Sequence, residues 1–524
     1  MRPTAAIALA LLATPLAAQQ TVPERTNNER TSTHAEVLAF LDSLAARGAA
    51  IRVGHLGTSP DGREIPYVIA ARPLVDDPVA ARRTGKPVLY IQANIHAGEV
   101  EGKEALQQVL RELTLGALRP LLDSVIVVAV PIYNSDGNEA FGPVTRNRPE
   151  QDGPPMVGLR PNGQGYDLNR DYVKQEAPET RGALALIAAW DPDLFMDLHT
   201  TDGSYHGYAL TFSPGLNANR TPANAWVQDT VLEAIRVRMR QRHKTEIYPY
   251  GNFVDQTPDS LQKGWVTYES TPRFGTNLMG MTRLSILSEA FSHDPFGRRI
   301  EATHDFVVET IRWLAEHAAD VRNHMARTIA ARPDSVAVRS DFAPPRMDTV
   351  IAEVTHSTGR GAGGFAPRER TGEFRRVWMP VTDRFMATRS EKIPAAYLLD
   401  PQWSDVVALL VRQGVTVERL DTPWTGPAEH FRIDSLTVLR PFEGHRAVRA
   451  DGSWQAAAPD SMPAGSFLVS TDQRFGMLAA FLLEPASEDG YTNWNFFDRG
   501  MRARGLHPVS RVMALPAVPR TVVR

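Results

Sequence analysis

The most constraining feature of this chain is a set of four short, mainly apolar runs separated by segments with helical patterning. The runs occupy residues 87–93, 124–131, 193–197 and 284–288. Runs of this length without polar alternation are typical of strands buried on both faces of a sheet. Helical patterns fit residues near 98–113, 222–242 and 304–330. The alternation predicts an α/β fold, with a mixed central sheet flanked by helices on both faces.

The length of the chain predicts more than one domain. At 524 residues it exceeds what a single hydrophobic core usually organises. Short apolar pieces broken by proline and charge indicate a linker at about 330–345. We therefore expect a first domain over residues 24–330. After it, residues 345–524 should form a smaller, β-rich α+β C-terminal domain, for which the sequence indicates no role.

The first residues have the pattern of an export signal. Arg2 supplies a positive start, and a run of small and aliphatic residues follows from Ala5 to Leu16. This run is shorter than the roughly 20 residues that a membrane span needs, so a short anchor is the weaker interpretation. Residues 1–18 are predicted to be a signal peptide, cleaved near Ala18, that sends the protein to the periplasm or outside the cell.

Composition excludes several kinds of chemistry. The chain has no cysteine, so it offers no thiol nucleophile and no thiolate ligand, and any transition metal must be held by His and carboxylates. The formal net charge of −3 gives no reason to expect nucleic acid as a partner. No segment after the signal has the pattern of a membrane span, and the oligomeric state stays open.

Two segments offer metal ligands where apolar runs end. His96 and Glu99 directly follow the run 87–93, and His199 follows the run 193–197. A lone His-x-x-Glu pair is often a chance feature of a surface helix. Because ligands gather at the carboxyl ends of strands in α/β sheets, we expect these three side chains to converge. Two His and one Glu leave a fourth position for water, as in catalytic zinc sites.

Two further segments carry groups suited to hydrolysis. Asp167, Asn169 and Arg170 lie close together in a loop-like stretch, and Arg is suited to a fork-like grip on a carboxylate. Glu289 ends the apolar run 284–288. A carboxylate there is either an ion-paired structural group or a proton acceptor for a water on a metal.

Taken in chain order, these four segments resemble the motifs of the zinc carboxypeptidases of the carboxypeptidase A and T type. The chain looks like a member of a bacterial exported branch of that family. The turn at 131–137 is also similar to the family's, and the resemblance spans about residues 32–318. The resemblance implies a single zinc ion and a peptide substrate. The roles that it implies are metal ligation by His96, Glu99 and His199, orientation of the first ligand by Asp167, binding of the substrate carboxylate by Asn169 and Arg170, general base and acid catalysis by Glu289, and oxyanion stabilisation by Arg148, with Arg146 as the alternative.

Two positions depart from the family pattern. Tyr268 lies at the distance before Glu289 expected of a substrate-capping Tyr, but its neighbours do not match. Arg273 is either a reader of substrate charge or a paired surface residue. Substrate selectivity is therefore left open.

The function implied is hydrolysis of a peptide bond near a free C-terminal carboxylate. The first alternative is a zinc amidase that acts on cell-wall peptides or acylated amino acids. The second is an exported binding protein without turnover.

Overall fold

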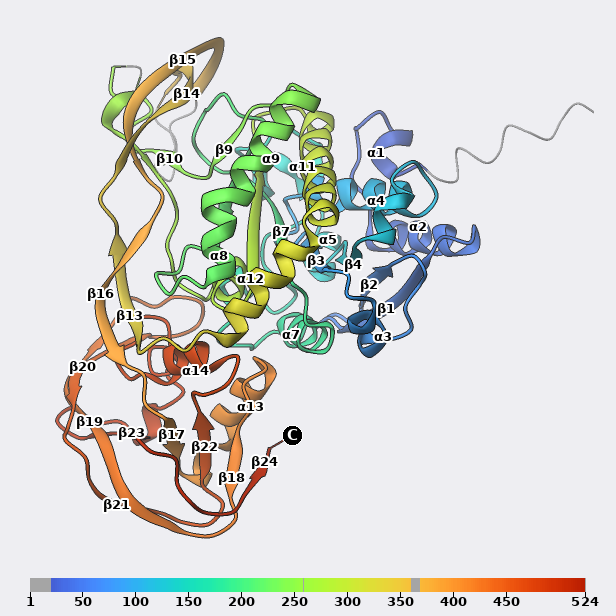
Figure 1. Cartoon of the computed structure of the whole chain (residues 1–524). Coiled ribbons are helices and arrows are strands. Elements are labelled where there is room, and N and C mark those ends of the chain that lie inside the picture. The colour runs from blue at the N-terminus through green and yellow to red at the C-terminus, as the bar shows by residue number, and fades with distance from the viewer. Residues whose placement is uncertain (1–19, 258, 360–367, 524) are drawn as a thin grey trace, which may run out of the picture.

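The computed structural model describes residues 20–257, 259–359 and 368–523 (Figure 1). The predicted signal peptide, residues 1–18, lies outside the described residues. The first part of the chain forms an eight-stranded sheet in the order β1-β2-β4-β3-β7-β12-β8-β9. Its strands are β1 (Ile51–Thr58), β2 (Glu64–Ala70), β3 (Val88–Ala93), β4 (Ile126–Val130), β7 (Leu194–Thr200), β8 (Leu210–Pro214), β9 (Ile247–Pro249) and β12 (Leu284–Ala290).

The four predicted apolar runs form the centre of this sheet. They are β4, β3, β7 and β12, which run parallel to one another. Antiparallel pairs flank them on both sides: β1 with β2, β2 with β4, and β12 with β8. The sheet is therefore mixed, as the sequence predicts, and the carboxyl ends of its four central strands meet along one edge.

Helices cover both faces of the sheet because alternate residues of each strand point in opposite directions. Leu89 and Ile91 of β3 pack into the apolar cluster of one face, and Val88 and Tyr90 pack into that of the other. The helices of the first face are α2 (His34–Ala46), α4 (Glu101–Thr114), α9 (Leu232–Arg238) and α11 (Phe296–Glu316), and those of the second face are α7 (Pro178–Trp190) and α10 (Gly275–Gly280). The predicted fold class is confirmed.

Two predicted helices differ in detail from the structure. The helix expected at 304–330 begins earlier, at Phe296, and is divided at His317 into α11 and α12 (Ala318–Ala330). The helix expected near residue 98 begins at Glu101, because a turn comes first. The helix expected at 222–242 is confirmed: α8 (Pro222–Trp226), a π-helical turn (Val227–Val231), α9 and a second π-helical turn (Met239–His243) follow one another without a break.

The second part of the chain is β-rich. Its eight-stranded sheet runs in the order β20-β19-β23-β17-β22-β18-β24, and β21 pairs with β19. These strands are β17 (Ala396–Leu399), β18 (Glu418–Leu420), β19 (Trp424–Val438), β20 (Val448–Trp454), β21 (Ala458–Met462), β22 (Phe467–Ser470), β23 (Leu506–Val512) and β24 (Arg520–Val522), with α13 (Ser404–Arg412) and α14 (Gly476–Leu483).

A long two-stranded ribbon links the two parts and runs back along the first sheet (Figure 1). Strand β15 of this ribbon pairs in parallel with β11 of the first part. The ribbon strands and the remaining short elements are β13 (Ser335–Phe342), β14 (Arg346–Ser357), β15 (Arg368–Thr382), β16 (Phe385–Lys392), β5 (Gly142–Pro143), β6 (Met156–Val157), β10 (Asn252–Phe253), β11 (Trp265–Val266), α1 (Val22–Arg25), α3 (Pro78–Thr84), α5 (Ser135–Glu139) and α6 (Val144–Asn147). The ribbon thus forms a separate four-stranded sheet with two strands of the first part, in the order β10-β11-β15-β14.

The two parts also share apolar packing. One cluster of buried side chains contains residues of α7 and α10 together with residues of α13 and α14. Leu410 and Leu478 of the second part are buried in this cluster with Ile187 of the first. Among the helices of the described residues, none is long and apolar enough to cross a membrane.

One buried acid gives the stability of the C-terminal part a defined pH dependence. Glu484 follows α14, is fully buried, and accepts hydrogen bonds from the Tyr397 hydroxyl (2.7 Å) and the Trp454 ring nitrogen (2.9 Å). Burial raises the pKa of its carboxyl from 4.5 to about 7. Between these values the folded chain retains a proton that the unfolded chain releases, so this group lowers the free energy of unfolding as the pH rises.

Glu484→Gln is therefore expected to reduce the loss of stability between about pH 5.5 and about pH 7.5 by about 2 kcal/mol. Denaturant unfolding of the wild type and the variant at both pH values measures this difference. Equal losses in the two proteins would show that Glu484 ionises normally in the folded state.

Candidate active site

The turn after β3 brings His96 and Glu99 to the same side. The Glu99 amide donates to the His96 carbonyl (3.0 Å), and the Asn94 side-chain amide donates to the Glu99 carbonyl (3.3 Å). Asn94 itself has φ 65°, a left-handed conformation that Asn tolerates better than most residues. Gly98 is required in this turn because a Cβ there would lie 2.6 Å from Cγ of Arg148.

His199 and Glu289 come from the ends of two neighbouring strands. The register of β7 with β12 pairs His199 with Glu289 directly. Paired residues of adjacent strands point to the same face and lie about 4.8 Å apart along the hydrogen-bonding direction. Because β3 and β7 are also parallel neighbours, the turn that carries His96 lies at the same edge. The sheet therefore brings together the groups that the sequence singled out at its strand ends.

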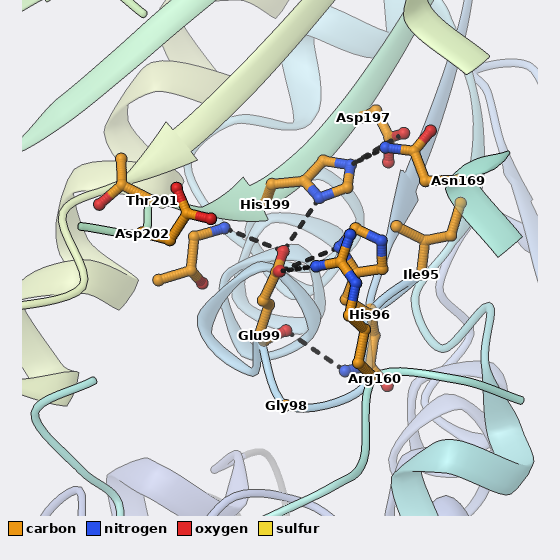
Figure 2. Close-up of polar contacts among 12 residues, drawn as sticks. Ile95, His96, Gly98, Glu99, Arg160, Asn169, Asp197, His199, Thr201 and Asp202 are labelled. Atoms are coloured by element: carbon orange, nitrogen blue, oxygen red, sulfur yellow. Dashed lines mark hydrogen bonds and ion pairs between the residues drawn. The ribbon is translucent and has the colours of Figure 1, made fainter. Parts of the chain in front are cut away.

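His96, Glu99 and His199 form a buried triad suited to a metal ion (Figure 2). One ligand atom of each residue lies within 4.8 Å of the others. The Nδ1 atom of His96 is 2.9 Å from one Glu99 oxygen, and Nδ1 of His199 is 2.9 Å from the other. Two imidazoles and a carboxylate are the donor set of catalytic zinc sites, so these residues fit zinc.

The outer nitrogen of each imidazole lies close to a carboxylate. Nε2 of His96 is 3.0 Å from Asp167 in hydrogen-bonding geometry, and Nε2 of His199 is 3.1 Å from Asp197, an ion-pair distance without that geometry. A donated Nε2–H leaves Nδ1 free to bind a metal, and such partners fix the tautomer and raise the basicity of the ligand. Asp197 was not singled out from the sequence. The sequence feature that could have identified Asp197 is its position two residues before His199, which places both side chains on the same face of the strand.

The charge environment keeps Glu99 ionised, as a metal ligand must be. Burial opposes ionisation, but His96 and Arg148 prevail and hold the pKa of the Glu99 carboxyl well below its usual value. Arg148 is itself buried and donates to Glu99 (3.0 Å) and to the carbonyls of Thr200 and Thr201. Arg146, the alternative to Arg148, is exposed and donates to Asn147.

Glu289 has the opposite environment. Burial raises the pKa of its carboxyl well above the usual value, and the nearby carboxylates of Glu99 and Asp202 act in the same direction. His199 and Arg148 oppose this rise. Within one site, Glu99 is thus held as an anion while Glu289 is poised to take up a proton, and pKa values pushed apart in this way are characteristic of acid–base sites.

Asn169 and Arg170 lie on the short 3₁₀ turn η3 (Leu168–Arg170). Asp167 begins this turn and accepts a hydrogen bond from the Asn169 amide (2.9 Å), so one carboxylate orients His96 and also shapes the turn. The Asn169 side chain lies 3.3 Å from Nε2 of His199. The Arg170 guanidinium stacks over the Phe274 ring at 3.9 Å.

The predicted site residues gather around one cavity of about 390 Å³. Its lining includes His96, Glu99, His199, Glu289, Arg148, Asn169, Arg170 and Tyr268. The Tyr268 hydroxyl donates to Asn277 (3.2 Å). Four titratable residues of the lining were not singled out from the sequence: Arg160, Asp202, Tyr250 and Glu269. No spacing pattern marks them, because each reaches the cavity from a different loop.

Arg160 contacts both Glu99 of the triad (Figure 2) and Asp167. It donates to Asp167 (2.9 Å) and lies 3.5 Å from Glu99. Arg273, for which two interpretations were open, is ion-paired with Glu269 and does not line the cavity. A larger cavity of about 560 Å³ lies beside β9 and the ribbon. It shares only Tyr250 with the site and contains none of the predicted residues, so we assign it no part in the chemistry.

Comparisons with known proteins agree with this arrangement. Residues 37–273 match the model of the zinc carboxypeptidase family. Carboxypeptidase 2 of Trichophyton equinum is 23% identical over 455 residues, which cover 83% of this chain and 78% of that protein. Mouse carboxypeptidase D (Mus musculus) is 28% identical over 173 residues, which cover 28% of this chain and 12% of that protein.

A solved structure of carboxypeptidase A from Helicoverpa armigera is also similar. It aligns with a TM-score of 0.41 and 18% identity, covering 56% of this chain and 74% of that chain.

The fold and the site define an α/β protein with a candidate metal centre at the carboxyl edge of its sheet. Residues 37–273 thus match the zinc carboxypeptidase family, and the protein is a zinc metallopeptidase.

Proposed function

We propose that this protein is a metallocarboxypeptidase that hydrolyses the peptide bond next to a free C-terminal carboxylate. The observation that carries the proposal is the meeting of three groups in one cavity: the His96–Glu99–His199 triad, Glu289 and Arg170. A metal centre beside a titratable carboxylate suits hydrolysis, and a guanidinium in the same cavity suits recognition of an anionic end of the substrate.

The triad would hold the zinc through the two Nδ1 atoms and the Glu99 carboxylate, with Asp167 and Asp197 fixing the rings. When bound, zinc supplies Lewis acidity and lowers the pKa of water. The carboxylate of Glu289 takes a proton from the attacking water and delivers it to the leaving amine. A raised pKa suits this role, because the group must be both base and acid near neutral pH.

Arg148 would stabilise the negative charge that develops on the carbonyl oxygen of the scissile bond. Its guanidinium is buried, and neighbouring backbone carbonyls already orient it. A group held in this way needs little reorganisation during the reaction, which is what makes electrostatic stabilisation effective. We assign Arg160 no separate step, since it is engaged with Asp167.

Asn169 and Arg170 would bind the terminal carboxylate of the substrate, and Tyr268 would cover the bound residue. Arg170 has one hydrogen bond along its own loop, to the Asn169 carbonyl (3.0 Å), and otherwise stacks on Phe274. No ion pair of Arg170 within hydrogen-bonding distance occurs among the described residues. Its charge is therefore available to an incoming carboxylate.

The remaining proposals concern location and organisation. We propose that residues 1–18 direct export to the periplasm or the outside of the cell. Residues 24–330 form the catalytic domain, and residues 345–524 form an accessory domain.

Digestion of a peptide library, read by mass spectrometry, tests the proposed reaction. We expect peptides to lose single residues from a free C-terminus and their C-terminal amides to resist cleavage. Arg170→Ala should raise KM for the free acids by about 100-fold, because a charge-assisted contact to the substrate is lost. Arg146→Ala, which removes an exposed Arg outside the cavity, is the matched control.

Cleavage restricted to acyl-amide or cell-wall isopeptide linkages would replace the carboxypeptidase proposal with the amidase. Absence of turnover on every substrate, with zinc bound, would leave only a binding role.

A further inference from the structure

A single loop, residues 269–275, contacts both members of the proposed carboxylate-binding pair. The Gly275 amide donates to the side-chain oxygen of Asn169 (3.1 Å). The ring of Phe274 lies beneath the Arg170 guanidinium at 3.9 Å. The direction of both polar groups is thus set by two consecutive residues, Phe274 and Gly275, and a shift of this loop would move both groups together.

The same loop is anchored by the C-terminal part of the chain. One oxygen of Asp489 accepts a hydrogen bond from the Arg273 backbone amide (2.6 Å), directly before Phe274. The other oxygen accepts from the Trp494 ring nitrogen (2.8 Å). Asp489 is fully buried, and a buried carboxylate is costly unless such partners are present. Its two bonds therefore form a defined connection between Trp494 and the loop.

The segment that follows Arg170 is also held by the C-terminal part of the chain. The Gln413 side chain donates to the Tyr172 carbonyl (2.6 Å), and His445 lies 2.9 Å from the Glu176 carboxylate. The Lys174 ammonium stacks over the Trp494 ring at 4.5 Å and donates to the Arg170 carbonyl (2.7 Å). Trp494 is therefore connected to both loops of the pair, to one through Asp489 and to the other through Lys174.

A third contact reaches the start of the turn that carries the pair. The Asp167 backbone amide donates to the Glu443 carboxylate (3.2 Å). Contacts from three separate segments of the C-terminal part thus converge on the loops of one subsite. An interface that only joined two domains would not need to converge on the residues that flank Asn169 and Arg170.

We propose that the C-terminal part of the chain is a positioning element of the carboxylate subsite, and that Asp489 is its principal positioning residue. The inference rests on the proposed function and gives the accessory domain a role in it. Asp489 acts through the Phe274–Gly275 pair and does not touch the substrate. Because misplacement of a binding group by about 1 Å can cost about 100-fold, small movements of this loop are enough to affect the reaction.

The test compares Asp489→Asn with the wild type on a peptide and on its C-terminal amide. An Asn oxygen accepts from Arg273 or from the Trp494 ring nitrogen, but its NH₂ group cannot accept from the other. KM for the free acid is expected to rise about tenfold with kcat changed less than about twofold. The inhibition constant of the amide should stay within about twofold, because the amide has no carboxylate for Arg170 to bind.

Glu484→Gln is the matched control, since Glu484 is an equally buried acid of the same part of the chain. It contacts Tyr397 and Trp454 and has no hydrogen bond to residues 269–275. Its KM should equal that of the wild type. If Asp489→Asn yields no folded protein, Trp494→Phe tests the inference in its place. This variant keeps a ring for Lys174 but removes the donor to Asp489, and its KM for the free acid is expected to rise about threefold.

An unchanged KM in the folded Asp489 or Trp494 variant overturns the inference, and so does an equal rise in the amide inhibition constant. Either result leaves the carboxypeptidase proposal intact. A wild type that does not distinguish the acid from the amide instead contradicts the proposed function itself.

Discussion

Replacing Glu289 by Gln is expected to lower kcat on peptide substrates by about 10³-fold, with KM and zinc content nearly unchanged. Gln keeps the size of the side chain and a hydrogen-bonding oxygen, but it cannot take a proton from water. Glu289 lies beside His199 on the neighbouring strand, so the variant removes the proton acceptor without removing a ligand. Steady-state kinetics and metal analysis of the same preparation measure both quantities.

Asp202→Asn is the control for this experiment, since Asp202 is another carboxylate of the same cavity. Asp202 is exposed, and the only hydrogen bond of its side chain within the described residues is a long one from the Tyr250 hydroxyl (3.4 Å). We expect its kcat to change less than about tenfold. Equal kcat in Glu289→Gln and the wild type would exclude Glu289 as the base and would favour a binding protein or a different proton acceptor.

Replacing His199 by Ala is expected to lower bound zinc from about one ion per chain to a small fraction, and hydrolysis should fall in parallel. Only His96 and Glu99 would remain, and two ligands do not complete a catalytic zinc site. The variant also frees Asp197 and one Glu99 oxygen from their shared partner. Removal of zinc from the wild type with a chelator should reproduce the loss, and added zinc should reverse it.

His356→Ala serves as the control, because His356 is an exposed imidazole on β14, outside the triad. It should retain both zinc and activity. Full zinc content in His199→Ala would show that the metal is held elsewhere. Full activity after complete removal of zinc would contradict the assignment as a metallopeptidase.

The central sheet could be predicted because its signal is local. Each of β3, β4, β7 and β12 contains a mainly apolar run without regular polar alternation, and burial on both faces favours this pattern whatever the neighbours are. The break at His317 could not be predicted, because the helical pattern continues through it. The short strands of the second sheet alternate irregularly, so the sequence predicted their class but not their order.

The sequence by itself determined the candidate metal triad of this protein, and only the tertiary structure decided what holds Asn169 and Arg170 in place. His96 and Glu99 share one turn, and His199 ends a strand, so spacing and strand position were sufficient to predict their meeting. The partners Asp197, Arg160 and Asp489 were not predictable in this way. Asp489 lies 216 residues from Arg273, and their contact depends on how α14 and the loop after it pack against the first sheet. Packing between distant segments leaves no periodic pattern in the chain, and for that reason only the folded structure connects the C-terminal part to Asn169 and Arg170.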